Sequence, residues 1–299
     1  MPGVKNYLSL VKFSHTIFAM PFAMIGFFLG WIYLNTADLS GTDPNLLEWK
    51  RIVIRFLLVL CCMVFARSAA MAFNRYLDRR FDALNPRTAI REIPAGIITP
   101  QSALVFTIIN CLLFITATWF INRVCFYLSP VALAVVLGYS YTKRFTPLCH
   151  LVLGLGLSLA PIGAYLAVTG IFNWLPVLFS LVVIFWVSGF DIIYALQDVD
   201  FDRSQHLFSI PAWLGKPRAL RVSELLHVLS TSAAIAAGII GHFSWLYWLG
   251  ILVFAGCLIY QHSIVKPNDL KRVNIAFMTM NGIASVVFGI FVIADLFIR

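Results

Sequence analysis

The sequence predicts an all-α integral membrane protein with about nine transmembrane helices. Of its 299 residues, 61% are hydrophobic and only 12% are charged, whereas an ordinary soluble domain is roughly 25% charged. Apolar stretches of about 20 residues, enough to cross a hydrocarbon core of roughly 30 Å, recur along the whole chain. This recurrence argues against a cleaved signal peptide followed by a soluble domain.

The apolar stretches give the helices in chain order. Short polar loops separate them, and no repeat is visible beyond two acidic motifs, so we treat residues 1–299 as a single transmembrane domain. The expected spans are 16–34, 51–73, 101–121, 124–141, 148–170, 173–195, 222–241, 244–264 and 275–298.

The basic residues predict the orientation in the membrane. The N-terminus and the second, fourth, sixth and eighth loops together hold 16 of the 22 Lys and Arg residues, while the first loop carries Asp38, Asp43 and Glu48. Because cytoplasmic loops are enriched in Lys and Arg, we expect the N-terminus in the cytoplasm and the C-terminus outside, in a bacterial inner membrane. The scattered charge forms no single patch, so we expect no nucleic-acid partner.

Two long polar segments, 74–100 and 196–221, follow the second and sixth spans and therefore fall on the same, cytoplasmic side. In the first, a spacing of four residues places three oxygen-bearing side chains on one helical face. In the second, offsets of three and four do the same. The first stripe is Asn74, Asp78 and Asp82; the second is Asp191, Tyr194, Asp198 and Asp202.

Carboxylates one turn apart repel each other, and beside hydrocarbon their charge is costly unless something neutralises it. Hard oxygen ligands without paired Cys or His favour Mg²⁺, which is commonly shared with substrate phosphates. The alternative is that the acids pair with Arg75, Arg79 and Arg80 on a solvated helix end; two stripes of matched spacing favour the metal. The candidate metal ligands are Asn74, Asp78, Asp82, Asp198 and Asp202.

Three basic residues are candidates for binding a diphosphate. Lys143 and Arg144 end the fourth span, and Tyr139 lies four residues before Lys143; the alternative for the basic pair is anchoring on the cytoplasmic side. Arg67 lies within the second span, seven residues before Asn74 and on nearly the same face. A charge there is expensive unless it faces a polar cavity, so we expect Arg67 to bind a substrate anion.

These motifs resemble the signatures of the UbiA prenyltransferases over essentially the whole chain. The first signature is similar to Asn74-Arg-Tyr-Leu-Asp78-Arg-Arg-Phe-Asp82-Ala-Leu-Asn85-Pro86-Arg87-Thr88, the second to Asp191-Ile-Ile-Tyr194-Ala-Leu-Gln-Asp198-Val-Asp-Phe-Asp202. The pair Tyr139 and Lys143 is similar to the basic motif between them. One departure is His206, where the 4-hydroxybenzoate branch commonly has Gly; it leaves the conformation of that loop open.

The resemblance implies a helical bundle around a central cavity, a Mg²⁺ cofactor, and transfer of a prenyl group from a polyprenyl diphosphate to an aromatic acid in the membrane. In this scheme the catalytic residues are Asp191, Tyr194 and Tyr139. Asp191, expected to be buried deeper than Asp198, would orient or deprotonate the acceptor. The aromatic faces of Tyr139 and Tyr194 would stabilise an allylic cation.

Several alternatives remain open at this point. The acceptor is either 4-hydroxybenzoate, for ubiquinone, or 1,4-dihydroxy-6-naphthoate, for menaquinone; the segment from His15 to Pro21 resembles the 4-hydroxybenzoate group. His15 and Asn281 either line the acceptor site or have hydrogen-bonded packing roles. A different class of protein, a cation-coupled transporter, would have acids near the membrane midplane and interrupted helices.

Overall fold

The apolar stretches form helices because a chain surrounded by lipid must satisfy its backbone hydrogen bonds within each segment. The computed structural model describes residues 3–11, 18–37 and 46–298; His15, Lys12, Asp38 and Asp43 lie outside these ranges. In the described part of the chain, eight helices are long and apolar enough to cross a membrane, and a shorter apolar helix accompanies them. The prediction of about nine transmembrane helices is confirmed.

The elements follow one another without strands in the described ranges. They are α1 (Val4–Leu10), α2 (Met20–Ala37), α3 (Leu46–Leu84), α4 (Pro100–Ile121), α5 (Arg123–Thr142), α6 (Cys149–Thr169), α7 (Trp174–Ala195), the 3₁₀ turn η2 (Leu196–Asp198), α8 (Val199–Ser204), α9 (Ile210–Leu214), α10 (Lys216–Ile240), α11 (Trp245–Ile264), the π-helical turn η3 (Ile275–Met280) and α12 (Asn281–Ile298).

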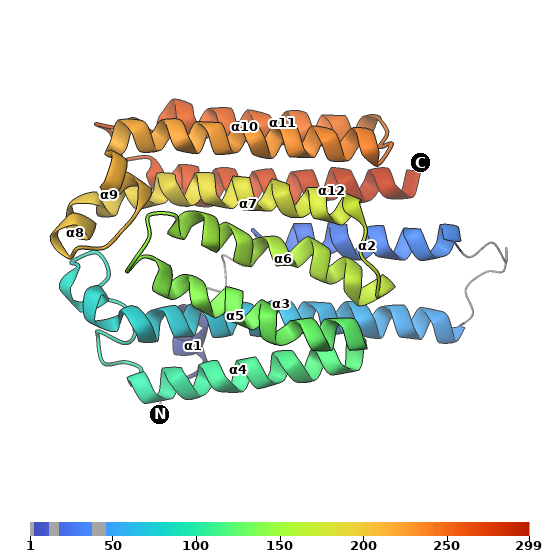
Figure 1. Ribbon diagram of the computed structural model, residues 1–299, viewed down its shortest axis with the longest axis horizontal. Helices are drawn as coiled ribbons and strands as arrows, with labels where there is room; N and C mark the ends of the chain where they lie inside the picture. Colours follow the sequence, from blue (N-terminus) through green and yellow to red (C-terminus); the bar gives the residue numbers. More distant parts are fainter. Residues whose placement is uncertain (1–2, 12–17, 38–45, 299) are drawn as a thin grey trace.

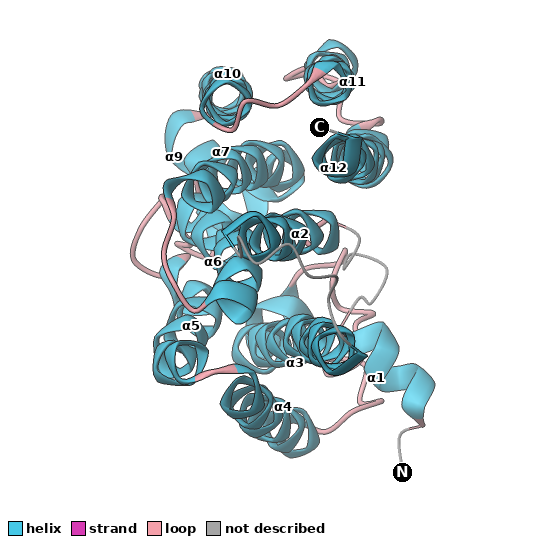
Figure 2. Cartoon of the chain, turned by 90° about the vertical axis from the view of Figure 1, so that its right-hand side faces the viewer, coloured by secondary structure: helices cyan, strands magenta, loops and turns pink. Residues whose placement is uncertain are grey.

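The long helices run side by side along the bundle (Figure 1). Seen end-on, α3, α4 and α5 lie on one side and α10, α11 and α12 on the other, with α2, α6 and α7 between them (Figure 2). The loops 85–99, 143–148, 205–209 and 265–274 gather at one end together with α8 and α9; we call this the polar end. The C-terminus lies at the opposite end.

Apolar side chains occupy both the inside and the outside of the bundle. Trp186 and Phe288 are fully buried in its core, whereas Leu112, Ile239 and Leu252 are each more than half exposed. Large apolar residues exposed along whole helices are expected where the solvent is lipid. The burial pattern therefore agrees with a membrane protein.

Two predicted polar loops contain more helix than the sequence analysis expected. The second span was expected to end at residue 73, but α3 has 39 residues and continues to Leu84. At 1.5 Å per residue it is about 58 Å long, so it extends well beyond a hydrocarbon core. Likewise, the segment 196–221 contains η2, α8, α9 and the start of α10 at Lys216. The acidic stripes therefore lie on helices.

Side-chain caps and a close helix contact set the geometry of the hairpins. Asn122 separates α4 from α5: its side chain accepts from Cys125 N at 2.8 Å and donates to Leu166 O at 2.8 Å. Asn173 caps α7 by accepting from Leu175 N at 3.0 Å. A Cβ added at Gly154 would lie 2.5 Å from Ile184 O, so only glycine allows α6 and α7 to approach this closely.

Asp295, near the end of α12, has a structural role that the sequence analysis did not foresee. It is fully buried, and its two carboxylate oxygens accept from Ser244 N at 2.9 Å and Tyr247 N at 3.1 Å. These are orphan donors at the N-terminus of α11, where a negative charge is also favoured by the helix dipole. Asp295 thus caps a neighbouring helix.

Replacing Asp295 with leucine is expected to destabilise the bundle by about 2–5 kcal/mol, because two buried N–H groups lose their acceptors. Asp295→Asn keeps one acceptor oxygen and should lose less. Thermal unfolding of the detergent-solubilised protein measures both. Equal melting temperatures for the wild type and Asp295→Leu would show that the cap does not stabilise the fold.

Candidate active site

A cavity of about 610 Å³ lies at the polar end of the bundle. Residues of α3, the loop after it, the end of α5, the start of α6, α7 and α8 form its wall. The wall includes every residue that the sequence analysis proposed for the site: Arg67, Asn74, Asp78, Asp82, Tyr139, Lys143, Arg144, Asp191, Tyr194, Asp198 and Asp202. The fold therefore brings both acidic stripes to one space.

The first stripe lies on the last turns of α3. Asp78 accepts from Arg144 Nη2 at 3.1 Å and from Asn74 Nδ2 at 3.1 Å. Asp82 is buried and accepts from Arg91 Nη1 at 2.6 Å, while Arg75 Nη1 lies 3.9 Å from its other oxygen. Each carboxylate is thus neutralised by a cation.

The second stripe continues from α7 through η2 into α8. Arg87 donates to Asp198 through Nε at 3.1 Å and Nη2 at 2.5 Å, and Asn85 Nδ2 donates to it at 3.3 Å. Asp202, fully buried, lies 2.7 Å from Lys143 Nζ and accepts from Ser209 Oγ at 2.9 Å. The partners of this stripe come from α3's loop and from the end of α5.

The basic partners differ from those in the alternative interpretation. Arg79 donates to Tyr76 O instead of to an aspartate, and among the described residues Arg75 forms an ion pair with Asp82 alone, at 3.9 Å. The close pairs come from distant segments. Burial alone would lower the pKa of Lys143, but attraction to Asp202 raises it above its ordinary value, so its ammonium group is charged at neutral pH.

The donor set fits a hard divalent cation. Asp82 Oδ2 is buried and accepts no hydrogen bond, which leaves a carboxylate oxygen for another partner. In the described part of the chain, no three His, Cys, Asp or Glu side chains converge to hold a metal unaided. Mg²⁺ suits such a set because it retains waters and shares ligands with phosphates. An ion that needs all its ligands from the protein does not suit this set of donors.

The charges on the cavity wall are balanced. Six acids, Asp78, Asp82, Glu92, Asp191, Asp198 and Asp202, face six cations, Arg67, Arg75, Arg87, Arg91, Lys143 and Arg144. A multiply charged anion would therefore meet no surplus of positive charge. A diphosphate bound here calls for an accompanying divalent cation.

Arg67 differs from the other cations. No described residue forms an ion pair with it, and its buried Nε atom has no hydrogen-bond partner. It nevertheless lies in α3 on the cavity wall. A guanidinium that faces a cavity with unused donors is suited to a ligand anion.

Asp191 belongs to a pair that the sequence analysis missed. Its Oδ2 lies 2.7 Å from His150 Nδ1, a histidine on the first turn of α6 to which no role was assigned. The expectation that Asp191 is more buried than Asp198 is wrong: their side chains are 25% and 13% exposed. Asp191 lies further back along α7, but it opens onto the cavity.

Aromatic rings line the same space. Tyr139 and Tyr194 are on the wall, and the ring of Tyr194 packs against that of Phe277 of η3, tilted by 33°, with ring centroids 4.3 Å apart. Arg87 Nη1 donates to the Tyr194 hydroxyl at 3.0 Å. Arg87 thus connects Tyr194 to Asp198. In the sequence analysis Arg87 appears only as part of the first signature, with no role assigned.

Two further residues have clear structural explanations. Asn281 is fully buried: it accepts from Trp186 Nε1 at 2.9 Å and Gln261 Nε2 at 2.7 Å, and donates to Phe277 O at 2.9 Å. Of its two expected roles, hydrogen-bonded packing is the one observed. His206 has a φ of 53°, in the left-handed region that favours glycine, so the backbone of this loop has a conformation that glycine adopts without strain.

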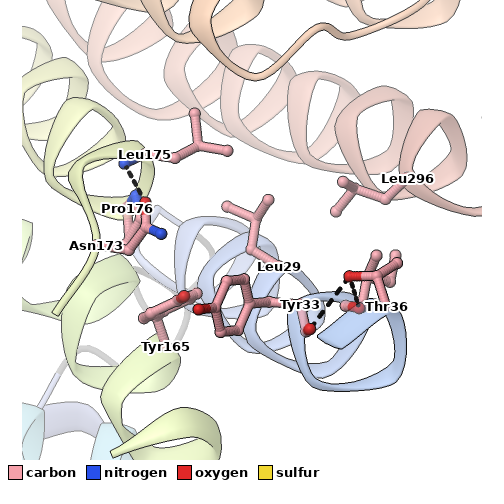
Figure 3. Close-up of a pocket in the computed structure, with 9 residues that line it drawn as sticks. Leu29, Tyr33, Thr36, Tyr165, Asn173, Leu175, Pro176 and Leu296 are labelled. Atoms are coloured by element: carbon pink, nitrogen blue, oxygen red, sulfur yellow. Dashed lines mark hydrogen bonds between the residues drawn. The ribbon is translucent and has the colours of Figure 1, made fainter. Parts of the chain in front are cut away.

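A second cavity, of about 310 Å³, lies at the opposite end of the bundle (Figure 3). Tyr33, Thr36, Tyr165 and Asn173 contribute its polar groups among apolar neighbours, and its wall contains no Asp, Glu, Lys, Arg or His among the described residues. It lacks the charged groups for metal or diphosphate chemistry. The candidate active site is the cavity at the polar end.

Comparisons with known proteins agree with this arrangement. The profile of the UbiA prenyltransferase family matches residues 31–283. A 4-hydroxybenzoate octaprenyltransferase of Tolumonas auensis is 32% identical over 78% of this chain and 82% of its own. A UbiA homologue from Aeropyrum pernix K1, solved in the apo state, is 30% identical, covers 94% of this chain and 98% of its own, and has a TM-score of 0.79.

A more distant structure shares the fold. A UbiA homologue from Archaeoglobus fulgidus, solved with DMAPP and Mg²⁺, is 20% identical over 98% of this chain and 100% of its own, with a TM-score of 0.70.

Proposed function

This chain is a member of the UbiA prenyltransferase family, and we propose that it transfers a polyprenyl group from its diphosphate to a ring carbon of an aromatic acceptor, 4-hydroxybenzoate, for ubiquinone synthesis. The single observation that carries the proposal is the cavity in which two acidic stripes face a matching set of cations. The name of the Tolumonas auensis relative supports the acceptor. The comparisons give no support to a transporter.

The polar residues of the cavity would bind the diphosphate. Mg²⁺ held by Asn74, Asp78, Asp82, Asp198 and Asp202 would neutralise negative charge on the phosphate oxygens. Arg87, Lys143 and Arg144 already reach the same space and would donate to those oxygens as the diphosphate leaves. A preorganised donor of this kind contributes about 3 kcal/mol to the stability of a transition state.

Bond making and breaking follow from the chemistry of an allylic diphosphate. The bond between the allylic carbon and the diphosphate oxygen breaks, and its electron pair leaves with the diphosphate. The faces of Tyr139 and Tyr194 would stabilise the resulting carbocation without attacking it. A ring carbon of the acceptor supplies the pair for the new carbon–carbon bond, and loss of the ring proton restores aromaticity.

Two residues further from the diphosphate would handle the substrates. Asp191 opens onto the cavity with one carboxylate oxygen not held by His150, so it would accept a proton from the acceptor or orient its hydroxyl group. Arg67, whose buried Nε has no hydrogen-bond partner among the described residues, would bind a substrate anion.

The proposed orientation places the polar end in the cytoplasm. The basic loops gather there, and positive charge is retained on the cytoplasmic side. The active site would then open to the cytoplasmic face of a bacterial inner membrane, where soluble aromatic acids are available. The C-terminus would lie outside.

Transfer from labelled geranyl diphosphate to 4-hydroxybenzoate and to 1,4-dihydroxy-6-naphthoate, by purified protein with Mg²⁺, tests this function. We expect prenylated 4-hydroxybenzoate, and no product after EDTA treatment. Product from the naphthoate alone would support prenyl transfer but would show that the acceptor is not 4-hydroxybenzoate. Product from neither acceptor would contradict the proposed function.

A further inference from the structure

His150 is a buried histidine at the junction of three segments. It lies on the first turn of α6, and its side chain is 3% exposed. Nδ1 faces Asp191 of α7 at 2.7 Å, and Nε2 accepts from Ile210 N at 3.4 Å. Its backbone carbonyl accepts from Ser188 Oγ, again on α7, at 3.1 Å. The imidazole ring is thus held from both sides.

These contacts fix the tautomer of the ring. A backbone N–H can only donate, so the nitrogen that accepts it, Nε2, carries no proton. Nδ1 carries a proton, and it donates to Asp191 Oδ2. Because a histidine with one occupied acceptor and one occupied donor cannot turn without breaking both bonds, it holds the carboxylate in one orientation.

We propose that His150 is a positioning residue for the acceptor reaction: it holds Oδ2 of Asp191 so that Oδ1 remains available to the aromatic acceptor in the cavity. This inference rests on the proposed function and adds the residue that orients the carboxylate of Asp191. His150 lines the cavity, but both of its ring nitrogens are hydrogen-bonded to other protein groups. His150 therefore acts through Asp191.

The segment that holds His150 also joins the second acidic stripe. Ser209, adjacent to Ile210, donates to Asp202 at 2.9 Å, and Phe208 N donates to Lys143 O at 2.7 Å. The histidine, the stripe and the basic pair thus share one support.

Three variants separate positioning from packing. In His150→Asn, the side-chain amide nitrogen takes the place of Nδ1 and still donates to Asp191. In His150→Leu this donor is absent. We expect kcat for transfer to 4-hydroxybenzoate to stay within about threefold in His150→Asn and to fall about 10- to 100-fold in His150→Leu, as for a misplaced catalytic group. Mg²⁺-dependent binding of geranyl diphosphate should be unchanged in both.

His227→Asn is the matched control, since His227 is equally buried but pairs with His262 away from this cavity. It should leave kcat unaltered. The third test variant combines His150→Leu with Asp191→Asn: if the histidine acts through the aspartate, the double variant transfers no more slowly than Asp191→Asn alone.

The outcomes are distinct. Suppose that the wild type is active. If His150→Leu then has the wild-type kcat, or if the double variant is slower than Asp191→Asn by the full factor that His150→Leu alone causes, the positioning role is overturned and the proposed function stands. Loss of geranyl diphosphate binding in His150→Leu, together with a lowered melting temperature, would make the histidine a packing residue. A wild type that prenylates no acceptor would overturn the proposed function and this role with it.

Discussion

Asp198→Asn is expected to reduce prenyl transfer by about 10²- to 10³-fold, the size of effect seen when a preorganised charge-stabilising group is removed. Asp198 accepts from Arg87 and Asn85 and is a candidate metal ligand on the cavity wall. Asparagine has nearly the same shape but no charge. The substitution would weaken metal binding and also the hydrogen bonds that fix the guanidinium of Arg87, which contacts the Tyr194 hydroxyl as well.

Asp200 supplies the control for this variant. It belongs to the same acidic motif, but it is exposed and does not line the cavity. Asp200→Asn should therefore transfer prenyl groups at the wild-type rate. Turnover and Mg²⁺-dependent binding of geranyl diphosphate should both fall in Asp198→Asn. Similar loss in the two variants would mean that the motif contributes only net charge.

Asp191→Asn is expected to lower kcat by about 10²- to 10⁴-fold, the usual range for loss of a general acid or base, while prenyl diphosphate binding stays intact. The reason is the separation of roles within the cavity. Asp191 contacts His150 and none of the five cations that pair with Asp78, Asp82, Asp198 and Asp202. Single-turnover transfer and equilibrium binding measure the two quantities separately.

A parallel loss of geranyl diphosphate binding in Asp191→Asn would contradict this separation. It would place Asp191 with the diphosphate ligands. The variant keeps a side chain of the same size, and its amide can still accept from His150, so a folding defect is not expected. The melting temperature provides the check.

Much of the site was predictable because it depends on helical periodicity. Asn74, Asp78 and Asp82 recur every four residues, so they share a face wherever the helix lies. Alternating loop composition predicted that both stripes lie on one side, and the structure has them at one end of the bundle. The helix count followed from the apolar lengths alone. These features are local, and local sequence determines them.

The contacts that were missed depend on tertiary structure. Arg87 follows the end of α3 in an irregular loop, and nothing in its spacing indicates that its guanidinium reaches Asp198 on another helix. His150 lies 41 residues from Asp191 in the sequence, and a lone histidine in an apolar stretch carries no pattern. The exposure of Asp191 likewise depends on the cavity, which only the packed helices create.

The end of α3 at Leu84 was missed for another reason. Hydropathy ends the span where charged residues begin, near Asn74, but backbone hydrogen bonding does not depend on hydropathy. The side chains beyond this point find partners in Arg144 and Arg91, so the helix continues to Leu84. Hydropathy marks the membrane boundary, whereas the helix ends where its capping and loop residues begin.

Equilibrium binding of labelled geranyl diphosphate to the purified protein, across a titration of Mg²⁺, tests the central claim most directly. The charge-balanced cavity predicts saturable binding that needs Mg²⁺, disappears with EDTA, and is lost in a variant combining Asp78→Asn with Asp198→Asn. Binding that is equally tight with EDTA, or retained in the double variant, would contradict a metal–diphosphate site between the two acidic stripes.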